Sequence, residues 1–151
     1  MPRKGRNSRF RLRLLKQGQD WRVEDGFYVA HYLAKEIEAD VNIPGNEGTT
    51  PLFVAAQENH LDVVRCLGTE LEADVNKRDN EGTTPFFVAA QENHLGVVRC
   101  LGTELGTNVN KARDDCFTPL IIAAQVPEHH NDHVVNCLLK MQADPQLRCV
   151  E

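Results

Sequence analysis

The feature that most constrains the fold of this chain is an internal repeat of 34 residues. From Asn46 the chain reads NEGTTPLFVAAQENHLDVVRCLGTELEADVNKRD, and the same segment returns from Asn80 with only seven substitutions. A third and looser copy begins at Phe117 with FTPLIIAAQ, and FYVAHYLAKEIEADVN, from Phe27 to Asn42, matches part of a fourth. A repeat of this length indicates a solenoid, in which one small unit stacks on the next and buries a shared core.

Each copy predicts a pair of helices. Thr50 is a residue type that caps the free N–H groups of a first helix, and Pro51 suits the first helical position because its missing N–H does no harm there. Ala55 and Ala56 are small enough for another helix to approach closely, and Asn59 tolerates the left-handed conformation that ends a helix.

The second helix of each copy carries an apolar stripe. In the first full copy this stripe is Leu61, Val64, Leu67 and Leu71. Residues 74–82 are too polar and too rich in turn formers for a helix, so we expect a hairpin loop that ends at Gly48 or Gly82, where a positive φ costs little.

These motifs resemble the ankyrin repeat. Its signature T-P-L-H-x-A corresponds here to TPLFVA, TPFFVA and TPLIIA. The resemblance covers residues 27–147 and implies an all-α ankyrin-repeat solenoid of helix-turn-helix units joined by β-hairpin-like loops.

The expected organisation follows from the register of the copies. We predict a disordered basic tail, an ankyrin-repeat domain that begins with a degenerate unit and continues with three repeats, and a short C-terminal tail. Their ranges are 1–8 for the basic tail, 9–147 for the domain, 9–45 for the degenerate unit, 46–79, 80–113 and 114–147 for the repeats, and 148–151 for the last tail.

The copies also depart from the family pattern. The histidine after T-P-L is replaced by Phe53, Phe87 and Ile121, so the hydrogen bonds of that histidine are lost. Cys116 stands where glycine is expected, and extra residues around 127–130 make the third repeat the least regular. The usual repeat of 33 residues is one longer here, near Gly68 and Gly102. A glycine within a helix costs about 1 kcal/mol relative to alanine, so we expect both second helices to bend or shorten there.

Charge is distributed unevenly along the chain. Residues 1–20 carry seven basic residues and one acidic residue, whereas the rest of the chain has a net charge of -11 within a total of -5. An acidic body argues against broad nucleic-acid binding by the repeats. Three interpretations of the basic tail stay open: a patch for nuclear import or nucleic acid, a mitochondrial presequence, or a solubilising leader.

The sequence shows neither an apolar run long enough to span a membrane nor a secretory signal, so we expect an intracellular protein, cytoplasmic and/or nuclear, with no membrane partner. The five cysteines include no CxxC pair. Cys66, Cys100 and Cys137 fall in one frame of the repeat, where a disulfide between neighbours is disfavoured by distance, so we expect them to be buried thiols in a reducing compartment.

The family resemblance implies a function in protein–protein interaction, as a scaffold, adaptor or inhibitor, through a concave face. That face is built from hairpin tips and first helices, and its acidic side chains predict a partner with a basic segment. We expect reversal of the charges at Glu58 and Glu92 to slow association.

An exposed aromatic core is one interpretation of this face, and packing of Phe53 and Phe87 between repeats is the other. The predicted contact residues are Asn46, Glu47, Thr49, Phe53, Gln57, Glu58, Arg78, Asn80, Glu81, Thr83, Phe87, Gln91, Glu92, Asp114, Asp115, Phe117, Ile121 and Gln125.

The alternative function is a nuclear regulatory factor that uses its basic tail on nucleic acid. We expect a monomer, with an end-to-end dimer as the other possibility. No Ser/His/Asp or Cys/His set recurs at a useful spacing and no phosphate-binding glycine loop is present, so the chain is not expected to be an enzyme or to need a cofactor.

Two groups of histidines in this chain are interpreted differently. The cluster His129, His130, Asp132 and His133 has metal-ligand spacing, but a solvated inserted loop is the preferred interpretation, and no metal site is predicted. His60 and His94 are expected to bind backbone carbonyls between repeats.

The resemblance also implies that an asparaginyl hydroxylase is able to modify Asn42, Asn76 or Asn110, although the extra residue weakens the match to such a site.

Overall fold

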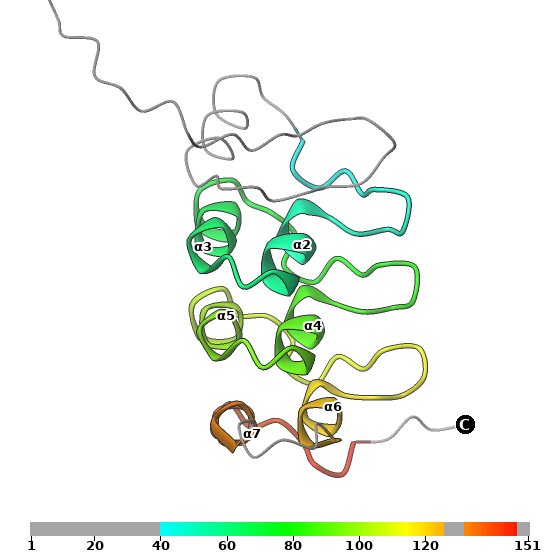
Figure 1. Ribbon diagram of the computed structural model, residues 1–151, viewed down its shortest axis with the longest axis vertical. Coiled ribbons are helices and arrows are strands. Elements are labelled where there is room, and N and C mark those ends of the chain that lie inside the picture. Colours follow the sequence, from blue (N-terminus) through cyan, green and yellow to red (C-terminus); the bar gives the residue numbers. More distant parts are fainter. Residues whose placement is uncertain (1–39, 126–131, 148–151) are drawn as a thin grey trace, which may run out of the picture.

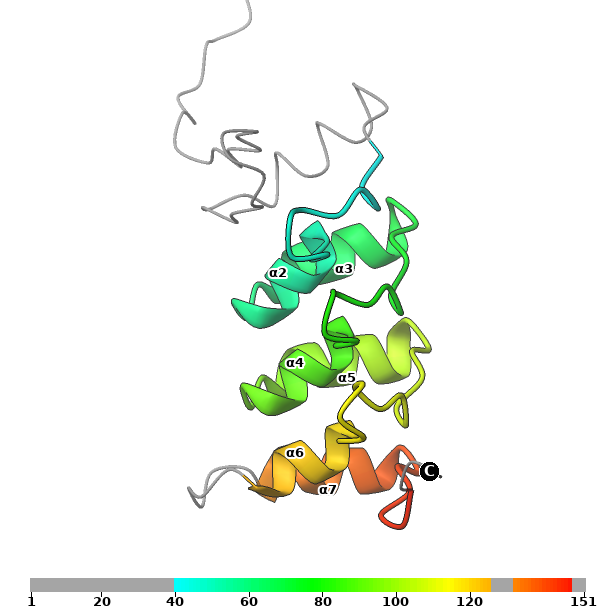
Figure 2. The same ribbon diagram turned by 90° about the vertical axis from the view of Figure 1, so that its right-hand side faces the viewer.

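The computed structural model describes residues 40–125 and 132–147, and in these ranges the chain forms helices and loops without a strand. The helices pair as α2 with α3, α4 with α5 and its π-helical continuation η1, and α6 with α7. First helices and second helices form two parallel columns, and the loops project beside the first helices (Figure 1). The pairs stack one on the next (Figure 2). The bounds are α2 Pro51–Gln57, α3 Leu61–Thr69, α4 Pro85–Gln91, α5 Leu95–Arg99, η1 Cys100–Glu104, α6 Pro119–Gln125 and α7 Asp132–Lys140.

A buried threonine begins each first helix, as the sequence predicted. The side chains of Thr50, Thr84 and Thr118 each accept a hydrogen bond from the backbone N–H three residues later, at 3.1–3.2 Å. A proline follows each threonine as the first helical residue. Because both features are local to the chain, each first helix begins at the same point of the repeat.

The turn between the paired helices is also repeated. Asn59 and Asn93 each have a φ of 60°, the left-handed conformation expected at a helix end. The ring atom Nε2 of His94 lies 2.9 Å from the carbonyl oxygen of Gln57, which confirms for His94 the predicted bond to a backbone carbonyl of the preceding repeat. For His60, the matching part of the preceding unit lies outside the described residues, so its predicted bond stays a prediction.

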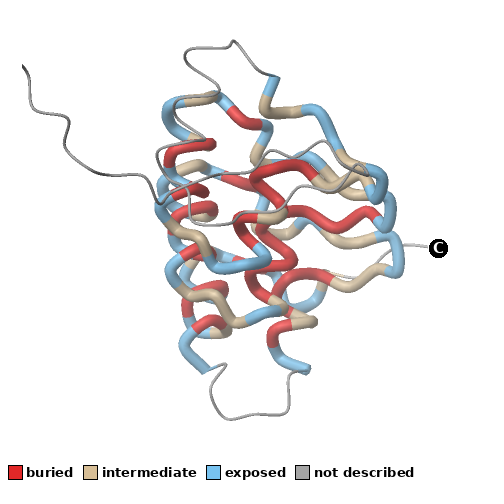
Figure 3. Tube along the Cα trace, turned by 45° about the horizontal axis from the view of Figure 1, so that its top comes forward, coloured by how far each residue is buried: buried red, intermediate tan, exposed pale blue. Residues whose placement is uncertain are grey.

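The core lies between the two columns of helices, and Figure 3 shows the buried residues running through the middle of the stack. Ala55, Ala56, Ala89 and Ala90 are completely buried where α2 packs on α4 and α4 packs on α6. Alanine at these positions allows the first helices to approach closely, as predicted.

The extra residue of each long repeat is absorbed at the end of the second helix. The N–H of Thr107 donates to the carbonyl of Leu101, six residues back, whereas in the third repeat, whose second helix ends without the extra residue, the N–H of Ala143 donates to Leu138, five residues back. In the second repeat this segment is the π-helix η1, the form that an inserted residue produces in a helix.

The expected shortening near Gly68 and Gly102 is seen in the second repeat, where α5 ends at Arg99 and the chain continues as the π-helix η1, which includes Gly102. In the first repeat α3 continues through Gly68 and ends at Thr69. Each glycine also makes room for the next repeat. A Cβ atom at Gly68 would lie 2.3 Å from Cδ1 of Leu105, and one at Gly102 would lie 2.6 Å from Sδ of Met141. A side chain at either position would therefore force the neighbouring side chain to shift.

The predicted burial of three thiols is confirmed, while the predicted reducing compartment stays a prediction. Cys66, Cys100 and Cys137 are buried and free. Burial raises the pKa of the Cys66 thiol and of the Cys100 thiol. Among the helices of the described ranges, none has the length and apolar character of a membrane span.

Several predictions fall outside the described residues. They concern the basic tail 1–8, most of the degenerate unit 9–45, His129 and His130, and the tail 148–151.

Candidate interaction surface

The hairpin tips are joined to one another by backbone hydrogen bonds. The N–H of Asn80 donates to the carbonyl of Glu47 at 3.0 Å, and the N–H of Asp114 donates to that of Glu81 at 3.4 Å. The side-chain amide of Asn80 adds a bond to the carbonyl of Asn46 at 3.1 Å. Three successive tips therefore form one edge of the molecule, beside the first helices (Figure 1).

Each tip is a tight turn that needs a left-handed residue. Gly48 and Gly82 have φ values of 78° and 80°, as expected for glycine at these positions. Cys116 takes the same place in the third tip with a φ of 72°, a conformation that an L residue rarely adopts. The third tip therefore keeps the shape of the other two despite the loss of glycine.

A groove of about 380 Å³ lies where the first two tips meet the first helices. It brings together half of the predicted contact residues. It also includes Asp79, Val88 and Arg113, which the sequence interpretation did not select. The predicted residues that line it are Asn46, Glu47, Thr49, Phe53, Gln57, Asn80, Glu81, Thr83 and Gln91.

The other predicted residues do not line this groove. Glu58 and Glu92 follow α2 and α4 as exposed capping residues. Gln125 is exposed at the end of α6, and Ile121 is half-buried on the same helix. Arg78, Asp114, Asp115 and Phe117 belong to the second and third tips.

The two phenylalanines of the first helices are covered, so an exposed aromatic core is the wrong interpretation. Phe53 is 5% exposed and Phe87 is 0% exposed, because the repeats pack directly against these rings. The other interpretation, packing between repeats, is correct. The groove is consequently mostly polar, and Phe53 and Val88 are the apolar residues that line it.

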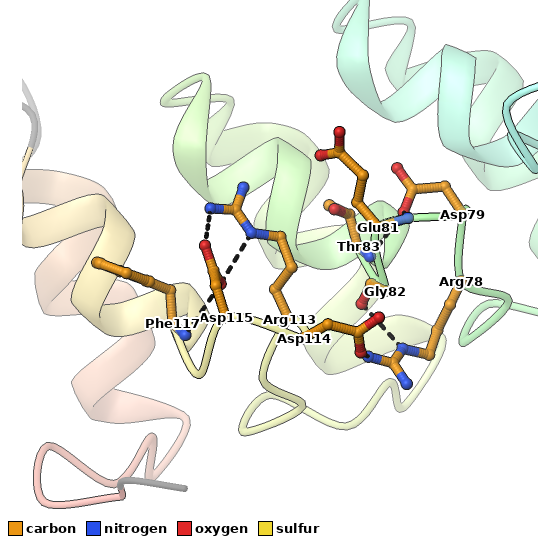
Figure 4. Close-up of polar contacts among 9 residues, drawn as sticks. All are labelled: Arg78, Asp79, Glu81, Gly82, Thr83, Arg113, Asp114, Asp115 and Phe117. Carbon is orange, nitrogen blue, oxygen red and sulfur yellow. Dashed lines mark hydrogen bonds and ion pairs between the residues drawn. The ribbon is translucent and has the colours of Figure 1, made fainter.

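Arg113 covers the ring of Phe87. Its guanidinium carbon lies 5.0 Å from the centroid of Phe87 and 6.0 Å from that of Phe117, within the range of cation–π attraction. The Asp115 carboxylate holds the guanidinium in this place through two hydrogen bonds (Figure 4). These bonds raise the pKa of Arg113 and lower the pKa of Asp115.

A second arginine ties the second tip to the third. Arg78 donates from Nε to the carbonyl of Gly82 at 2.8 Å and forms an ion pair with Asp114 (Figure 4). The side chain of Asp79 accepts bonds from the N–H groups of Glu81 and Thr83, at 3.0 and 2.7 Å. The aspartates of the tips are thus occupied in holding the loops together.

The glutamates are not occupied in this way. Among the described residues, Glu47, Glu58 and Glu81 make no side-chain hydrogen bond and no ion pair. Glu92 accepts one bond, from the amide of Gln91 at 3.1 Å. The free negative charge of this face therefore comes from glutamates, and the predicted contribution of Asp114 and Asp115 is neutralised within the chain.

Arg113 was detectable in the sequence. It is one of the seven substitutions between the first two copies, and it replaces the aspartate found at Asp79. A change of charge sign at this position was the signal, in the loop that holds five of the seven substitutions. Its role as a cover for Phe87 depends on stacking and was not visible in the sequence.

The described residues contain no group of three or more His, Cys, Asp or Glu side chains arranged to hold a metal ion. Asp132 and His133 belong to the first turn of α7. What this face offers chemically is recognition, through a groove with fixed loops, amide groups and unpaired carboxylates.

Comparison with known proteins agrees with this architecture. A family model described as "Ankyrin repeats (3 copies)" matches residues 13–79 and 71–149. No curated protein sequence matches the chain.

Proposed function

Because the chain belongs to the ankyrin-repeat family, whose repeats are in general protein–protein interaction modules, we propose that it binds a basic segment of a partner protein in the groove at its hairpin tips. The family is typically non-enzymatic. The observation that carries the proposal is the set of unpaired glutamates around a groove whose loops are already fixed.

The fixed loops favour binding because little conformational freedom is lost on association. Each tip is bonded to the next through its backbone, and Arg78 and Arg113 are held by aspartates. A pre-organised surface avoids part of the ordering cost of an interface. The carboxylates of Glu47 and Glu81 then remain available to lysine or arginine side chains of the partner.

The glutamates at the helix ends have a different expected role. Glu58 and Glu92 are exposed and do not line the groove. Charges at the rim of an interface act mainly on the rate of encounter, through steering that salt screens.

The test is selection of a displayed random peptide library on the wild-type protein, followed by surface plasmon resonance with the selected peptides. We expect lysine and arginine to be enriched. Glu47→Lys/Glu81→Lys should weaken binding about tenfold, because two charge pairs are lost and replaced by repulsion. Glu58→Lys/Glu92→Lys should slow association and reduce its dependence on salt.

The matched control is Asp62→Lys/Glu72→Lys, which makes the same change of net charge on α3 and in the turn that follows it. It should bind the selected peptides as the wild type does. Selected peptides without basic residues, or an equal loss of affinity in the control, would contradict the proposal.

A further inference from the structure

The second helices carry a charge reversal between one repeat interface and the next. Between α3 and η1, Arg65 donates two hydrogen bonds to the carboxylate of Glu104, from Nε to Oε2 at 3.0 Å and from Nη2 to Oε1 at 3.2 Å. This bidentate pair fixes the outer edge of the interface between the first two full repeats. It raises the pKa of Arg65 and lowers the pKa of Glu104.

The structure identifies which residue stands at the position of Glu104 in the third repeat. Glu104 is the last residue of η1, and Lys140 is the last residue of α7. The residue after each one lies against the glycine of the preceding repeat: Leu105 at Gly68, and Met141 at Gly102.

The backbone conformation after Glu104 and after Lys140 supports the same match between these two residues. Gly106 and Gln142, two residues beyond Glu104 and Lys140, have φ values of 64° and 62°. Lys140 is therefore the structural counterpart of Glu104, with an ammonium group in place of a carboxylate.

The arginine of the pair is retained. Arg99 stands 34 residues after Arg65 and is exposed at the end of α5. Within the described ranges, neither Arg99 nor Lys140 makes an ion pair or a side-chain hydrogen bond. Two unpaired cations thus occupy the interface where the preceding one has an ion pair.

A groove of about 540 Å³ lies at this place, between α5–η1 and α7, which are neighbours in the column of second helices (Figure 1). The cations Arg99 and Lys140 line it together with the polar His133 and Asn136 and the less polar Cys137 and Met141. A ligand that suits this lining carries negative charge beside an apolar side chain.

We propose that this groove binds an acidic segment of a partner protein, with one carboxylate placed on Arg99 as the Glu104 carboxylate is placed on Arg65. The segment supplies the charge that the third repeat lacks. The site is separate from the groove at the hairpin tips and has the opposite charge, so the two faces select partners of opposite kind.

The lining favours an acidic peptide over nucleic acid. Single-stranded nucleic acid is held by aromatic rings on which bases stack, in addition to basic groups. The residues that line this groove include no aromatic ring other than the imidazole of His133. Arginine also matches the planar geometry of a carboxylate, as the Arg65–Glu104 pair shows within this chain.

The experiment measures fluorescence anisotropy of a labelled peptide GELEELG, its neutral analogue GQLQQLG and a short labelled oligothymidine, on the full chain at neutral pH. We expect the glutamate peptide to bind and the glutamine peptide to bind about tenfold more weakly or not at all. Added salt should weaken the binding, because the groove is open to solvent.

The decisive variant is Lys140→Glu, which restores within the chain the carboxylate that Glu104 provides one repeat earlier. It should reduce peptide affinity about tenfold or more while the thermal unfolding temperature stays at or above that of the wild type. Arg99→Gln should also reduce affinity, without a new internal ion pair. The control Lys77→Glu makes the same charge change in the loop after α3 and should leave affinity within about twofold of the wild type.

Four results would overturn the proposal. They are unchanged affinity in both Lys140→Glu and Arg99→Gln, an equal loss in Lys77→Glu, equal binding of the glutamate and glutamine peptides, and tighter binding of oligothymidine that depends on Lys140. The first two would remove this groove as the site, and the last two would assign it a different ligand.

Discussion

At the scale of single residues, two opposed effects act at Gly68. Alanine in place of glycine within a helix gains about 1 kcal/mol from backbone conformational preference. The added Cβ at Gly68, however, would lie 2.3 Å from Cδ1 and 3.1 Å from Cγ of Leu105, well inside van der Waals contact. Leu105 packs against the core from the next repeat, so its displacement also loses buried apolar contacts.

We therefore predict that Gly68→Ala destabilises the protein by about 1 kcal/mol, since overpacking outweighs the gain in helix preference. With Leu105→Ala already present, the same substitution should become stabilising. Chemical denaturation of the wild type, the two single variants and the double variant gives the effect of Gly68→Ala on the free energy of unfolding with and without the Leu105 side chain. A stabilising effect of Gly68→Ala alone would mean that Leu105 moves aside without cost.

The residues that the sequence predicted well are those whose role is decided within a few neighbours. Thr50 and Thr84 cap their helices because the accepting side chain and the donating N–H are three residues apart. Phe87 was ambiguous because its ring is covered by Arg113, which lies far along the chain from it, beside the third hairpin tip. Gly68 was interpreted from helix preference alone, since the contact with Leu105 exists only after the repeats stack.

At the scale of elements, ion pairs reinforce repeats that apolar packing already holds together. The Arg65–Glu104 pair joins α3 to η1, and the Arg113–Asp115 pair fixes the third tip over Phe87. Both carboxyl groups have a pKa below the ordinary value, chiefly because an arginine donates hydrogen bonds to them. Since these groups are largely exposed to solvent, each contribution to stability is small.

The sign of the pH dependence of stability follows from the lowered pKa of these two carboxyl groups. A carboxyl group whose folded pKa is lowered stabilises the protein above the unfolded pKa, and the stabilisation is lost as the pH falls through the folded pKa. We predict that Glu104→Gln/Asp115→Asn lowers the unfolding temperature at pH 7, and that the difference from the wild type closes as the pH falls below about 4. Differential scanning calorimetry across this pH range measures the difference in unfolding temperature.

Glu72→Gln is the control for this series, because Glu72 is exposed and forms no ion pair within the described residues. Its unfolding temperature should follow that of the wild type at every pH. A difference for the double variant that persists at low pH would show that packing, and not charge, was altered.

At the scale of the whole molecule, the described repeats form a one-dimensional stack in which each repeat packs on its neighbours. α4 packs on both α2 and α6, whereas α6 packs on α4 and on its own partner α7. In such a stack, stability is close to a sum of repeat terms and interface terms. The position of a mutation along the stack should then decide how much of the molecule it loosens.

Val97 and Val134 offer a matched comparison, because they take the same place in the second and third repeats and both are completely buried. Truncation of either to alanine removes two methyl groups and should cost about 2 kcal/mol in local packing. Val97→Ala weakens interfaces on both sides of the middle repeat, so amide hydrogen exchange should rise in all three repeats. Val134→Ala should raise exchange mainly in α6 and α7, since α2 and α3 keep their packing on α4. If Val134→Ala raised exchange in α2 as much as in α6 and α7, the stack would unfold as a single cooperative unit. Charge or packing changes at either groove would then alter the stability of every repeat.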